Sequence, residues 1–324
     1  MGHVLLYNPR ERSRLRTRLL CWYDRHQRPL PWRATSDPYR IWISEIMLQQ
    51  TRVAAVLEHY RKFLERFPDV HALAAAPVSE VLAAWSGLGY YRRARHLHAA
   101  AREVVRRYGG NLPRTADQLM PLPGFGRYTS AAVASIAFGE PHAVLDGNVE
   151  RVLRRLLALT RARQNALWDT AGLLLSRRRP GDFNQAMMEL GATVCLPREP
   201  RCTHCVLKRW CATRAPQASA SPAKRRVRAI TVLLAQKNGR VSLVQRPKAA
   251  SVMPEMWELP VTDGKRACPI AVVRHAIMNT DYRVTVICGA PPRTAGVRSI
   301  ATARISSLPL TGLTRKILRR AGLL

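Results

Sequence analysis

The sequence predicts a mainly α-helical protein with two domains, of which the second is smaller and contains strands. The 324 residues suffice for two domains of ordinary size, and 47% of them are hydrophobic, so each domain can bury a core. Apolar residues recur at three- and four-residue spacing through most of residues 11–212, which is typical of helices. Strand-like runs begin only near residue 227.

The expected helices of the first domain are rich in Leu, Ala, Arg and Glu, and prolines and glycines separate them. They are Arg14–Asp24, Ile41–Phe67, Val78–Trp85, Arg92–Tyr108, Thr129–Phe138, Val149–Leu159 and Ala166–Arg177. Further helix starts are expected at Ser36–Pro38, at Thr115–Asp117 and at Asp182.

The composition changes after residue 212. Residues 213–221 are small, polar and proline-bearing, which is typical of a linker. Strands are expected at Val227–Ala235, Val241–Gln245 and Tyr282–Ile287, and a last helix at Leu310–Leu323. The predicted organisation is a helical domain over residues 9–212, a linker over 213–226 and an α+β domain over 227–324.

Charge is the strongest feature of the composition. The chain holds 53 Lys and Arg against 21 Asp and Glu, a net charge of +32. Such a surplus predicts a polyanionic partner, with nucleic acid the first candidate, although an arginine-biased proteome would also raise the charge. Residues 213–324 hold 20 basic against 4 acidic side chains, so the smaller domain is the more densely charged.

Two observations argue against a membrane or secreted protein. No stretch approaches 18 uninterrupted apolar residues, so no transmembrane span is expected. The N-terminal segment MGHVLLYNPRERSRLR has its apolar patch before its charges, whereas a secretion signal has the charges first.

Four of the seven cysteines cluster as C-x6-C-x2-C-x5-C, at Cys195, Cys202, Cys205 and Cys211. In a chain without a secretion signal this clustering favours a metal site over disulfides. Four thiolates suit zinc or a [4Fe–4S] cluster, and the spacing differs from the paired C-x2-C arms of structural zinc sites. The isolated cysteines are expected to be small buried hydrophobic residues; they are Cys21, Cys268 and Cys288.

The segment Leu122–Gly126, LPGFG, lies between two helical stretches. Its two glycines permit a tight turn whose backbone N–H groups point outward at a helix N-terminus. Such a turn binds a phosphate without reading a base, although a plain helix–helix turn is the alternative. Further along, Asp146 stands before a glycine and a helix, where it could simply be an N-cap.

One carboxylate, Glu45, stands in the strongly apolar helical segment IWISEIML. A buried acid is costly and needs a partner or a function. A salt bridge to an arginine is one explanation. The other is a carboxyl group whose pKa is raised by desolvation, so that it can act as an acid near neutral pH.

Taken in order, the hairpin, the following aspartate and the cysteine loop resemble the helix-hairpin-helix DNA glycosylases of the endonuclease III superfamily, and within it the MutY-type adenine DNA glycosylases. The segments that carry the resemblance are LPWR from Leu30, SEIMLQQTRV from Ser44, WSGLGYYRRA from Trp85, LPGFGRYTSAAV from Leu122, LDGNVERVL from Leu145 and FNQAMMELGATVC from Phe183. It covers nearly all of residues 9–212 and continues more weakly to residue 318.

The resemblance implies excision of adenine mispaired with 8-oxoguanine or guanine, after the base has left the stack. Glu45 would protonate N7 of adenine and then activate water, while Asp146 would stabilise the oxocarbenium-like sugar. Tyr128 and Asn148 would flank the sugar and the two carboxylates. Relatives that also cut the backbone carry a Schiff-base lysine at the hairpin position of Tyr128, so the resemblance implies a monofunctional enzyme.

The resemblance also assigns residues that bind the base, the DNA and the cofactor, although core packing is the alternative for the apolar ones. Around the extruded adenine it implies Arg28, Leu30, Trp32, Leu48 and Gln185. Against the DNA it implies the wedge residues Gln50, Thr51, Leu88 and Tyr90, and the hairpin residues Leu122, Gly124 and Gly126. The cysteine loop 195–211 would hold a [4Fe–4S] cluster through its four thiolates.

The smaller domain resembles the Nudix-like domain of the family, but it lacks the closely spaced glutamates that hold magnesium, so we expect binding rather than hydrolysis. In the family this domain reads 8-oxoguanine partly through a loop written His-x-Phe-Ser-His. The matching stretch here is HAIMN, residues 275–279, in which Met278 and Asn279 replace the serine and the second histidine. A relaxed preference for 8-oxoguanine is therefore expected.

Two alternatives are weighed against this interpretation. One is a related glycosylase for another mismatch, such as thymine opposite guanine; the other is a DNA-binding protein without activity. The presence of Glu45 and Asp146 argues against the second, and Glu45 with the Nudix-like domain argues against the first. We expect a monomer that acts on mispaired duplexes in the bacterial cytoplasm, associated with the nucleoid.

Overall fold

The computed structural model describes residues 7–159, 161–213, 225–263, 269–277, 279–290 and 296–324. The chain divides into two compact units, each built from two segments. The first unit joins residues 1–50 to 103–221, and the second joins 51–102 to 222–324. The expected linker over 214–224, Cys268 and Met278 lie outside the described residues.

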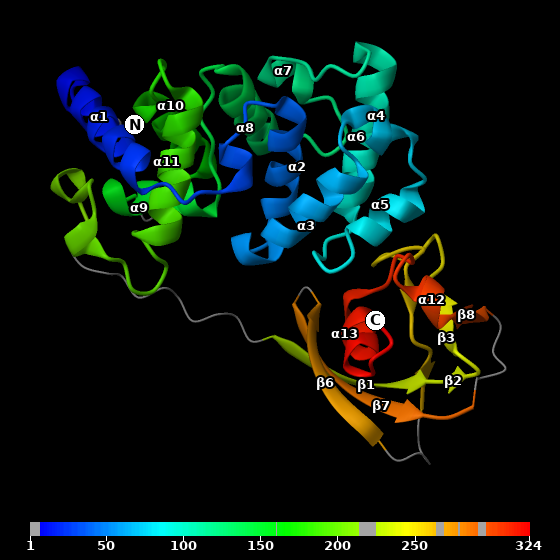
Figure 1. Cartoon of the computed structure of the whole chain (residues 1–324). Helices are drawn as coiled ribbons and strands as arrows, with labels where there is room; N and C mark the ends of the chain where they lie inside the picture. Colours follow the sequence, from blue (N-terminus) through cyan, green and yellow to red (C-terminus); the bar gives the residue numbers. More distant parts are fainter. Residues whose placement is uncertain (1–6, 160, 214–224, 264–268, 278, 291–295) are drawn as a thin grey trace. The chain divides into compact units, whose positions relative to one another are not determined.

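The described elements of the first unit are all helices (Figure 1). They are α1 (Pro9–His26), η1 (Pro31–Arg33), α2 (Pro38–Leu48), the end of α6 (Arg92–Tyr108), α7 (Ala116–Leu119), α8 (Arg127–Phe138), α9 (Gly147–Leu156), α10 (Gln164–Leu174), α11 (Pro180–Thr193), η2 (Cys202–His204) and η3 (Lys208–Trp210). The second unit holds the rest of α6 together with α3 (Val53–Arg66), α4 (Val70–Ala75), α5 (Val78–Ala84), α12 (Thr302–Ile305) and α13 (Gly312–Arg320).

The single helix expected over residues 41–67 is wrong, because two helices, α2 and α3, occupy that stretch. The chain turns between them at Gln50, which has a φ of 57°. The break falls in the polar stretch Gln49–Arg52, which contains neither proline nor glycine, so it was not distinguished from the exposed face of one continuous helix. A tertiary contact lies beside the turn, where the Gln49 side-chain amide donates to the Thr129 hydroxyl of α8 at 3.1 Å.

The core of the first unit forms where α1, α9 and α11 bury their apolar faces. Leu15, Leu19 and Tyr23 of α1 are almost fully buried in a cluster that also contains Leu153 and Leu190. Burial of apolar surface on this scale is the main source of a fold's stability.

The expectation of buried isolated cysteines is wrong for Cys21 and Cys288, which are both exposed. Cys21 lies on α1 away from its buried residues, and Cys288 ends a strand. The exposure of these two cysteines therefore follows from their positions on the helix and the strand, and not from the small apolar character of the side chain.

The second unit contains eight described strands in two four-stranded sheets (Figure 1). They are β1 (Arg226–Leu234), β2 (Gln236–Lys237), β3 (Arg240–Gln245), β4 (Trp257–Glu258), β5 (Val261–Thr262), β6 (Pro269–Ile277), β7 (Thr280–Cys288) and β8 (Val297–Ala301). One sheet has the order β5-β1-β7-β6, and the other contains β2-β3-β4 with β8 on β3. Strands β1 and β7 are parallel, whereas the other pairs are antiparallel.

The core of the sheet region lies between strands and the last helix. Val232, Val284 and Val286 of β1 and β7 pack in one cluster with Ile317 and Leu318 of α13. The smaller strand-containing region expected from the sequence is thereby confirmed, and β1, β3, β7 and α13 match expected elements. The elements that were not predicted are β2, β4, β5, β6, β8 and α12.

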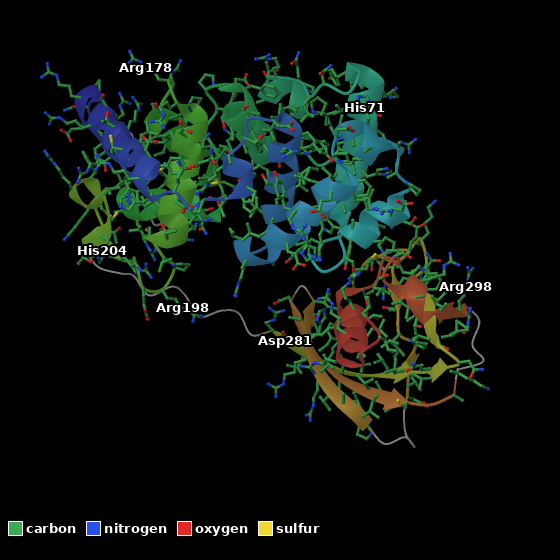
Figure 2. The ribbon with its side chains drawn as sticks, viewed as in Figure 1. His71, Arg178, Arg198, His204, Asp281 and Arg298 are labelled. Carbon is green, nitrogen blue, oxygen red and sulfur yellow. The ribbon has the colours of Figure 1, made fainter. Side chains whose placement is uncertain are left out.

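Arginine and lysine side chains project from the described surface of both units, as Arg178, Arg198 and Arg298 illustrate (Figure 2). Within the described residues, no helix combines the length and the apolar character needed to cross a membrane.

Candidate active site

Helix α2 holds Glu45 inside the first unit. Asp37 caps the helix by accepting the Tyr39 backbone N–H at 2.9 Å, and Pro38 supplies its first turn. Glu45 is only 6% exposed. Its Oε2 accepts a hydrogen bond from the Tyr128 hydroxyl at 2.8 Å, so its recorded partner is a tyrosine rather than an arginine.

Burial raises the pKa of Glu45 from its ordinary 4.5 to about 7, and the negative charge of Asp146 acts in the same direction. The Tyr128 hydrogen bond and the Arg33 charge oppose this rise. This confirms the inference of a desolvated carboxyl group. At neutral pH such a group exists in both protonation states. A residue that acts first as a general acid and then as a general base needs both.

Tyr128 lies in the first turn of α8, directly after the hairpin. Burial raises its pKa well above 10, and the charges of Glu45 and Asp146 add to the effect. The phenol therefore stays neutral and remains a hydrogen-bond donor to Glu45. It also contacts the Met188 sulfur at 3.4 Å.

Asp146 is the N-cap of α9, as the N-cap alternative predicted. One carboxylate oxygen accepts the Val149 backbone N–H at 2.7 Å, and the other accepts the Asn148 side-chain amide at 2.9 Å. The helix N-terminus carries partial positive charge, which favours a carboxylate there. The N-cap role of Asp146 is compatible with a role in the reaction, because the cap fixes the orientation of its carboxylate.

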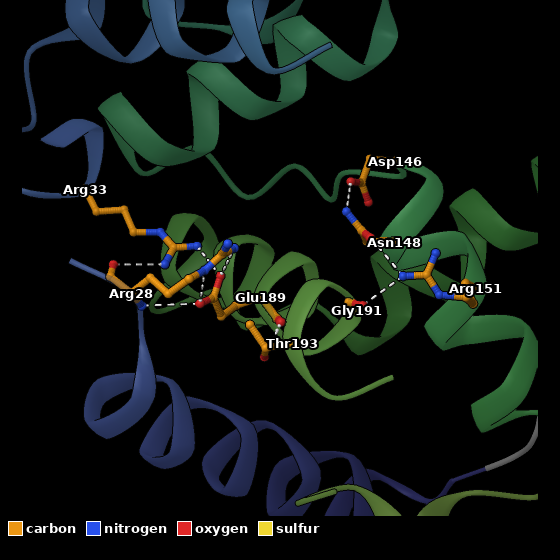
Figure 3. Close-up of polar contacts among 8 residues, drawn as sticks. All are labelled: Arg28, Arg33, Asp146, Asn148, Arg151, Glu189, Gly191 and Thr193. Atoms are coloured by element: carbon orange, nitrogen blue, oxygen red, sulfur yellow. Dashed lines mark hydrogen bonds and ion pairs between the residues drawn. The ribbon is translucent and has the colours of Figure 1, made fainter. Parts of the chain in front are cut away.

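Asn148 is held in turn by Arg151. The Arg151 Nη2 donates to the Asn148 side-chain oxygen and to the Gly191 carbonyl, both at 2.8 Å (Figure 3). Its Nε donates to the Cys195 carbonyl, also at 2.8 Å. Gly191 must be a glycine, because a Cβ there would meet the Asn148 Cβ at 2.6 Å. Hydrogen bonds thus connect the first cysteine of the loop with Asp146.

A second buried carboxylate, Glu189 of α11, binds two arginines (Figure 3). Arg28 donates from Nε and Nη2 at 2.7 Å each, and Arg33 donates from Nη2 at 2.8 Å. Burial alone would raise the pKa of Glu189, but the hydrogen bonds from Arg28 and Arg33 dominate and lower it to about 2. Glu189 therefore stays ionised and fixes both guanidinium groups.

Sequence reasoning missed Glu189, Arg33 and Arg151 as members of this network. Glu189 gave the same signal as Glu45, since it is one acid in an apolar helical segment. The arginine salt bridge considered for Glu45 is what Glu189 forms.

The remaining residues assigned to the adenine differ in exposure. Leu30 and Trp32 are buried, whereas Leu48 and Gln185 are partly buried. Packing in the core accounts for the burial of Leu30 and Trp32.

The hairpin is anchored by its apolar residues. Leu122 and Phe125 are buried, and the Phe125 ring lies 5.2 Å from the ring of Trp42 on α2. Gly124 has a φ of 81°, which a side chain would disfavour. Gly126 caps α8 without any side-chain hydrogen bond, and it is exposed, so the N–H groups of the first turn stay open for an anion.

The wedge residues also differ in exposure. Gln50 is exposed in the first unit. In the second unit Thr51 is partly buried, Leu88 is 5% exposed and Tyr90 is 49% exposed. Tyr90 thus presents a large apolar surface to solvent, whereas Leu88 does not.

The four clustered cysteines line one cavity of about 320 Å³, together with Arg155, Arg201, Lys208 and Arg209. Arg155 donates to the Cys195 sulfur at 3.4 Å. Across the described residues, no three His, Cys, Asp or Glu side chains converge closely enough for a single metal ion. Four thiols that line one basic cavity are a donor set that would fit an anionic iron–sulfur cluster.

The sequence matches a known protein family and several named relatives. Residues 43–169 match the family model described as HhH-GPD superfamily base excision DNA repair protein. The chain is 49% identical over 210 residues to an adenine DNA glycosylase of Mus musculus, a match that covers 60% of this chain and 41% of the mouse protein. It is 39% identical over 197 residues to an adenine DNA glycosylase of Buchnera aphidicola, covering 60% of this chain and 56% of that protein.

Among solved structures, a thermostable thymine-DNA glycosylase is similar at 34% identity with a TM-score of 0.59, covering 63% of this chain and 96% of that one. The chain therefore belongs to the HhH-GPD superfamily of base excision DNA repair proteins. It spans about half, or less, of the length of the curated adenine DNA glycosylases that it matches.

Proposed function

We propose that this protein is a monofunctional DNA glycosylase that excises adenine mispaired with 8-oxoguanine or guanine. The observation that carries the proposal is Glu45, a buried carboxyl group with a pKa near 7 that accepts a hydrogen bond from Tyr128. The similarity to adenine DNA glycosylases supports adenine as the base.

In the proposed reaction Glu45 donates its proton to N7 of the flipped adenine. The base then departs as a neutral molecule, which is a better leaving group than an anion. The N-glycosidic electron pair leaves with it, and the sugar becomes oxocarbenium-like, so the Asp146 carboxylate stabilises the positive charge. Glu45, now ionised, accepts a proton from the water that adds to C1′, and the product is an abasic site.

The Glu189 network has a place in the same proposal. Arg28 is bound through both Nε and Nη2, and its side chain keeps 37% of its surface exposed. Its guanidinium is therefore oriented and still accessible to a base. We assign it to the adenine, with Leu30, Trp32, Leu48 and Gln185 as its neighbours.

We further propose that Cys195, Cys202, Cys205 and Cys211 hold a [4Fe–4S] cluster, since four thiols line one cavity. When bound, the cluster would supply structural order to the loop rather than a reaction step. The exposed Lys208 and Arg209 of this loop, like the hairpin Leu122–Gly126, would then lie against phosphates.

For the smaller region we propose a Nudix-like domain that binds the mispair without hydrolysing nucleotides. Its charge of 20 basic against 4 acidic residues over 213–324 supports contact with duplex DNA. We expect the protein to work as a monomer on bacterial DNA, associated with the nucleoid.

The test is base release from three duplexes that carry adenine opposite 8-oxoguanine, adenine opposite guanine, or thymine opposite guanine. Adenine release from the first two is expected. The similarity to a thymine-DNA glycosylase makes thymine release the specific competing outcome. Binding to all three duplexes without any base release would indicate a DNA-binding protein without glycosylase activity.

A further inference from the structure

A single arginine of the second unit, Arg93, contacts two loops that the proposed function assigns to DNA. It lies in the first turn of α6, and its side chain is partly buried. Its Nη2 donates to the Thr51 hydroxyl at 3.0 Å and to the Leu88 carbonyl at 3.3 Å, with the Gly89 carbonyl at 3.4 Å. One guanidinium nitrogen thus connects the loop after α2 with the loop between α5 and α6.

The same guanidinium lies over two aromatic rings. Its carbon is 5.4 Å from the centroid of the buried Trp85 ring and 5.4 Å from that of the Tyr90 ring. Trp85 itself donates to the Gly89 carbonyl at 3.1 Å, so it also holds the loop. Arg93 therefore contacts the buried Trp85 ring and the half-exposed Tyr90 ring at the same time.

The loop that Arg93 holds has an uncommon backbone. Gly87, Gly89 and Tyr90 all have positive φ, and at 47° Tyr90 has a conformation that non-glycine residues adopt rarely. Such a conformation persists only when surrounding contacts fix it. Arg93 supplies three of these contacts, to Leu88, Gly89 and the Tyr90 ring.

We propose that Arg93 is a positioning residue that joins the two wedge loops and presents Tyr90 to the base opposite the excised adenine. Tyr90 has a cation over its ring and is still 49% exposed, so its remaining surface is available to stack on that base. The planar guanidinium suits this role because it donates to several acceptors and stacks on rings at once. The proposal rests on the proposed function, since it assigns Tyr90 to DNA, but Arg93 takes no part in bond cleavage.

The test compares Arg93→Met with Arg92→Met, which removes an exposed arginine one position earlier on α6. For adenine opposite 8-oxoguanine, we expect Arg93→Met to lower the single-turnover rate about 10- to 100-fold, the effect of losing a charged hydrogen bond. Arg92→Met should stay within about twofold of the wild type, as is usual for surface substitutions. Adenine opposite an abasic-site analogue has no partner base, so there Arg93→Met should lose less than about threefold.

A structural defect would lower both rates equally, and that result would overturn the proposal. Arg93→Lys should recover only part of the rate, because one ammonium cannot reproduce the planar contacts. Thr51→Val keeps the shape and removes the hydroxyl acceptor. We expect it to act in the same direction as Arg93→Met and less than additively with it, whereas full additivity would contradict a shared contact.

A second readout separates this inference from the proposed reaction. In a Glu45→Gln background, 2-aminopurine placed at the adenine position should brighten on binding, and Arg93→Met should reduce that rise at saturating protein. A protein that keeps Glu45 and brightens the probe normally, but releases no adenine from the mispaired duplex, overturns the reaction alone. Equal brightening with and without Arg93, or no brightening at all, overturns the positioning role.

Discussion

At the scale of single residues, Glu45 and Glu189 show how partners decide the state of a buried acid. Both are nearly inaccessible to water. Glu189 binds two guanidinium groups and has a pKa of about 2, whereas Glu45 is bonded to a neutral phenol and has a pKa of about 7. The first is thereby suited to structure and the second to proton transfer.

Glu45→Gln should abolish excision and leave DNA binding largely intact, because an amide keeps the shape but cannot donate a proton to N7. Losing a general acid costs about 10²- to 10⁴-fold, and we expect the top of this range since Glu45 also serves as base. Asp146→Asn should be similarly damaging through loss of charge stabilisation. Single-turnover rates and binding anisotropy check both variants. Wild-type rates in either one would show that the site is misassigned.

The raised pKa of Glu45 also has a cost in stability that depends on pH. The pKa of Glu45 is about 7 in the fold against an ordinary 4.5. The contribution of protonated Glu45 to the free energy of unfolding is therefore fully present below pH 4.5 and is lost as the pH rises through 7. Glu45→Gln removes this loss. Urea unfolding should therefore show the variant more stable than the wild type at pH 8, by up to roughly 3 kcal/mol less the value of the Tyr128 hydrogen bond, and little changed at pH 4.5.

Glu189→Gln is the matched control for that measurement. Its pKa is lowered to about 2, so its contribution is present above pH 4.5 and is lost as pH falls toward 2. We expect this variant to be destabilised at pH 8. An equal response of the two variants would contradict the assigned charge states.

Tyr128 should make the enzyme monofunctional, because its hydroxyl is committed to Glu45 and a phenol forms no Schiff base. Borohydride reduction during turnover of a mispaired duplex should therefore trap little covalent complex. The Tyr128→Lys variant serves as a comparison that places an amine at this position. Efficient trapping by the wild type would count against the monofunctional assignment.

At the scale of elements, helix N-termini position the residues of the proposed active site. Tyr128 stands in the first turn of α8 and Asp146 caps α9, while the hairpin leaves the N-terminus of α8 open. Arg151 joins α9 to the last turn of α11 and to the start of the cysteine loop. Order in that loop therefore supports the orientation of Asn148 and Asp146.

The cysteine loop should bind [4Fe–4S] when the protein is purified without oxygen. Protein prepared in this way should be brown and contain about four irons per chain. Cys202→Ala should lower iron content and the thermal stability of the first unit. Stoichiometric zinc without iron under the same conditions would reject the cluster.

At the scale of the whole molecule, the residues proposed to read the lesion belong to the smaller region. Asn279 lies in the turn between β6 and β7, and Met278 beside it lies outside the described residues. His275 belongs to β6 rather than to a loop, and it lies close to Gly312 of α13. Of the matching residues that the structure describes, Asn279 is thus the one in the turn.

We expect a weak preference for adenine opposite 8-oxoguanine over adenine opposite guanine. A methionine thioether cannot donate a hydrogen bond as a serine hydroxyl does, and one such bond is worth roughly 0.5–1.5 kcal/mol, or up to about tenfold. Met278→Ser with Asn279→His should raise the ratio of the two rates. If the double variant leaves the ratio unchanged and the wild type is already selective, this turn does not read the lesion.

The sequence alone determined the features that are encoded locally. Apolar periodicity predicted most helices, and the isolated acid in an apolar helix predicted a desolvated Glu45. These two predictions succeed because the pattern of burial along one element is encoded in neighbouring residues. The metal loop that the cysteine spacing indicates stays a prediction.

Only the tertiary structure decided which partners those residues meet. The break at Gln50, the pairing of Glu189 with Arg28 and Arg33, and the contact of Arg93 with Thr51 each join residues whose side chains the sequence does not pair. Glu45 and Glu189 show the same sequence signal, one acid among apolar residues. In the fold, however, Glu45 is hydrogen-bonded to a phenol and Glu189 to two guanidinium groups. Their opposite pKa shifts follow from electrostatic contacts across the fold, which depend on distance in space and not on distance along the chain.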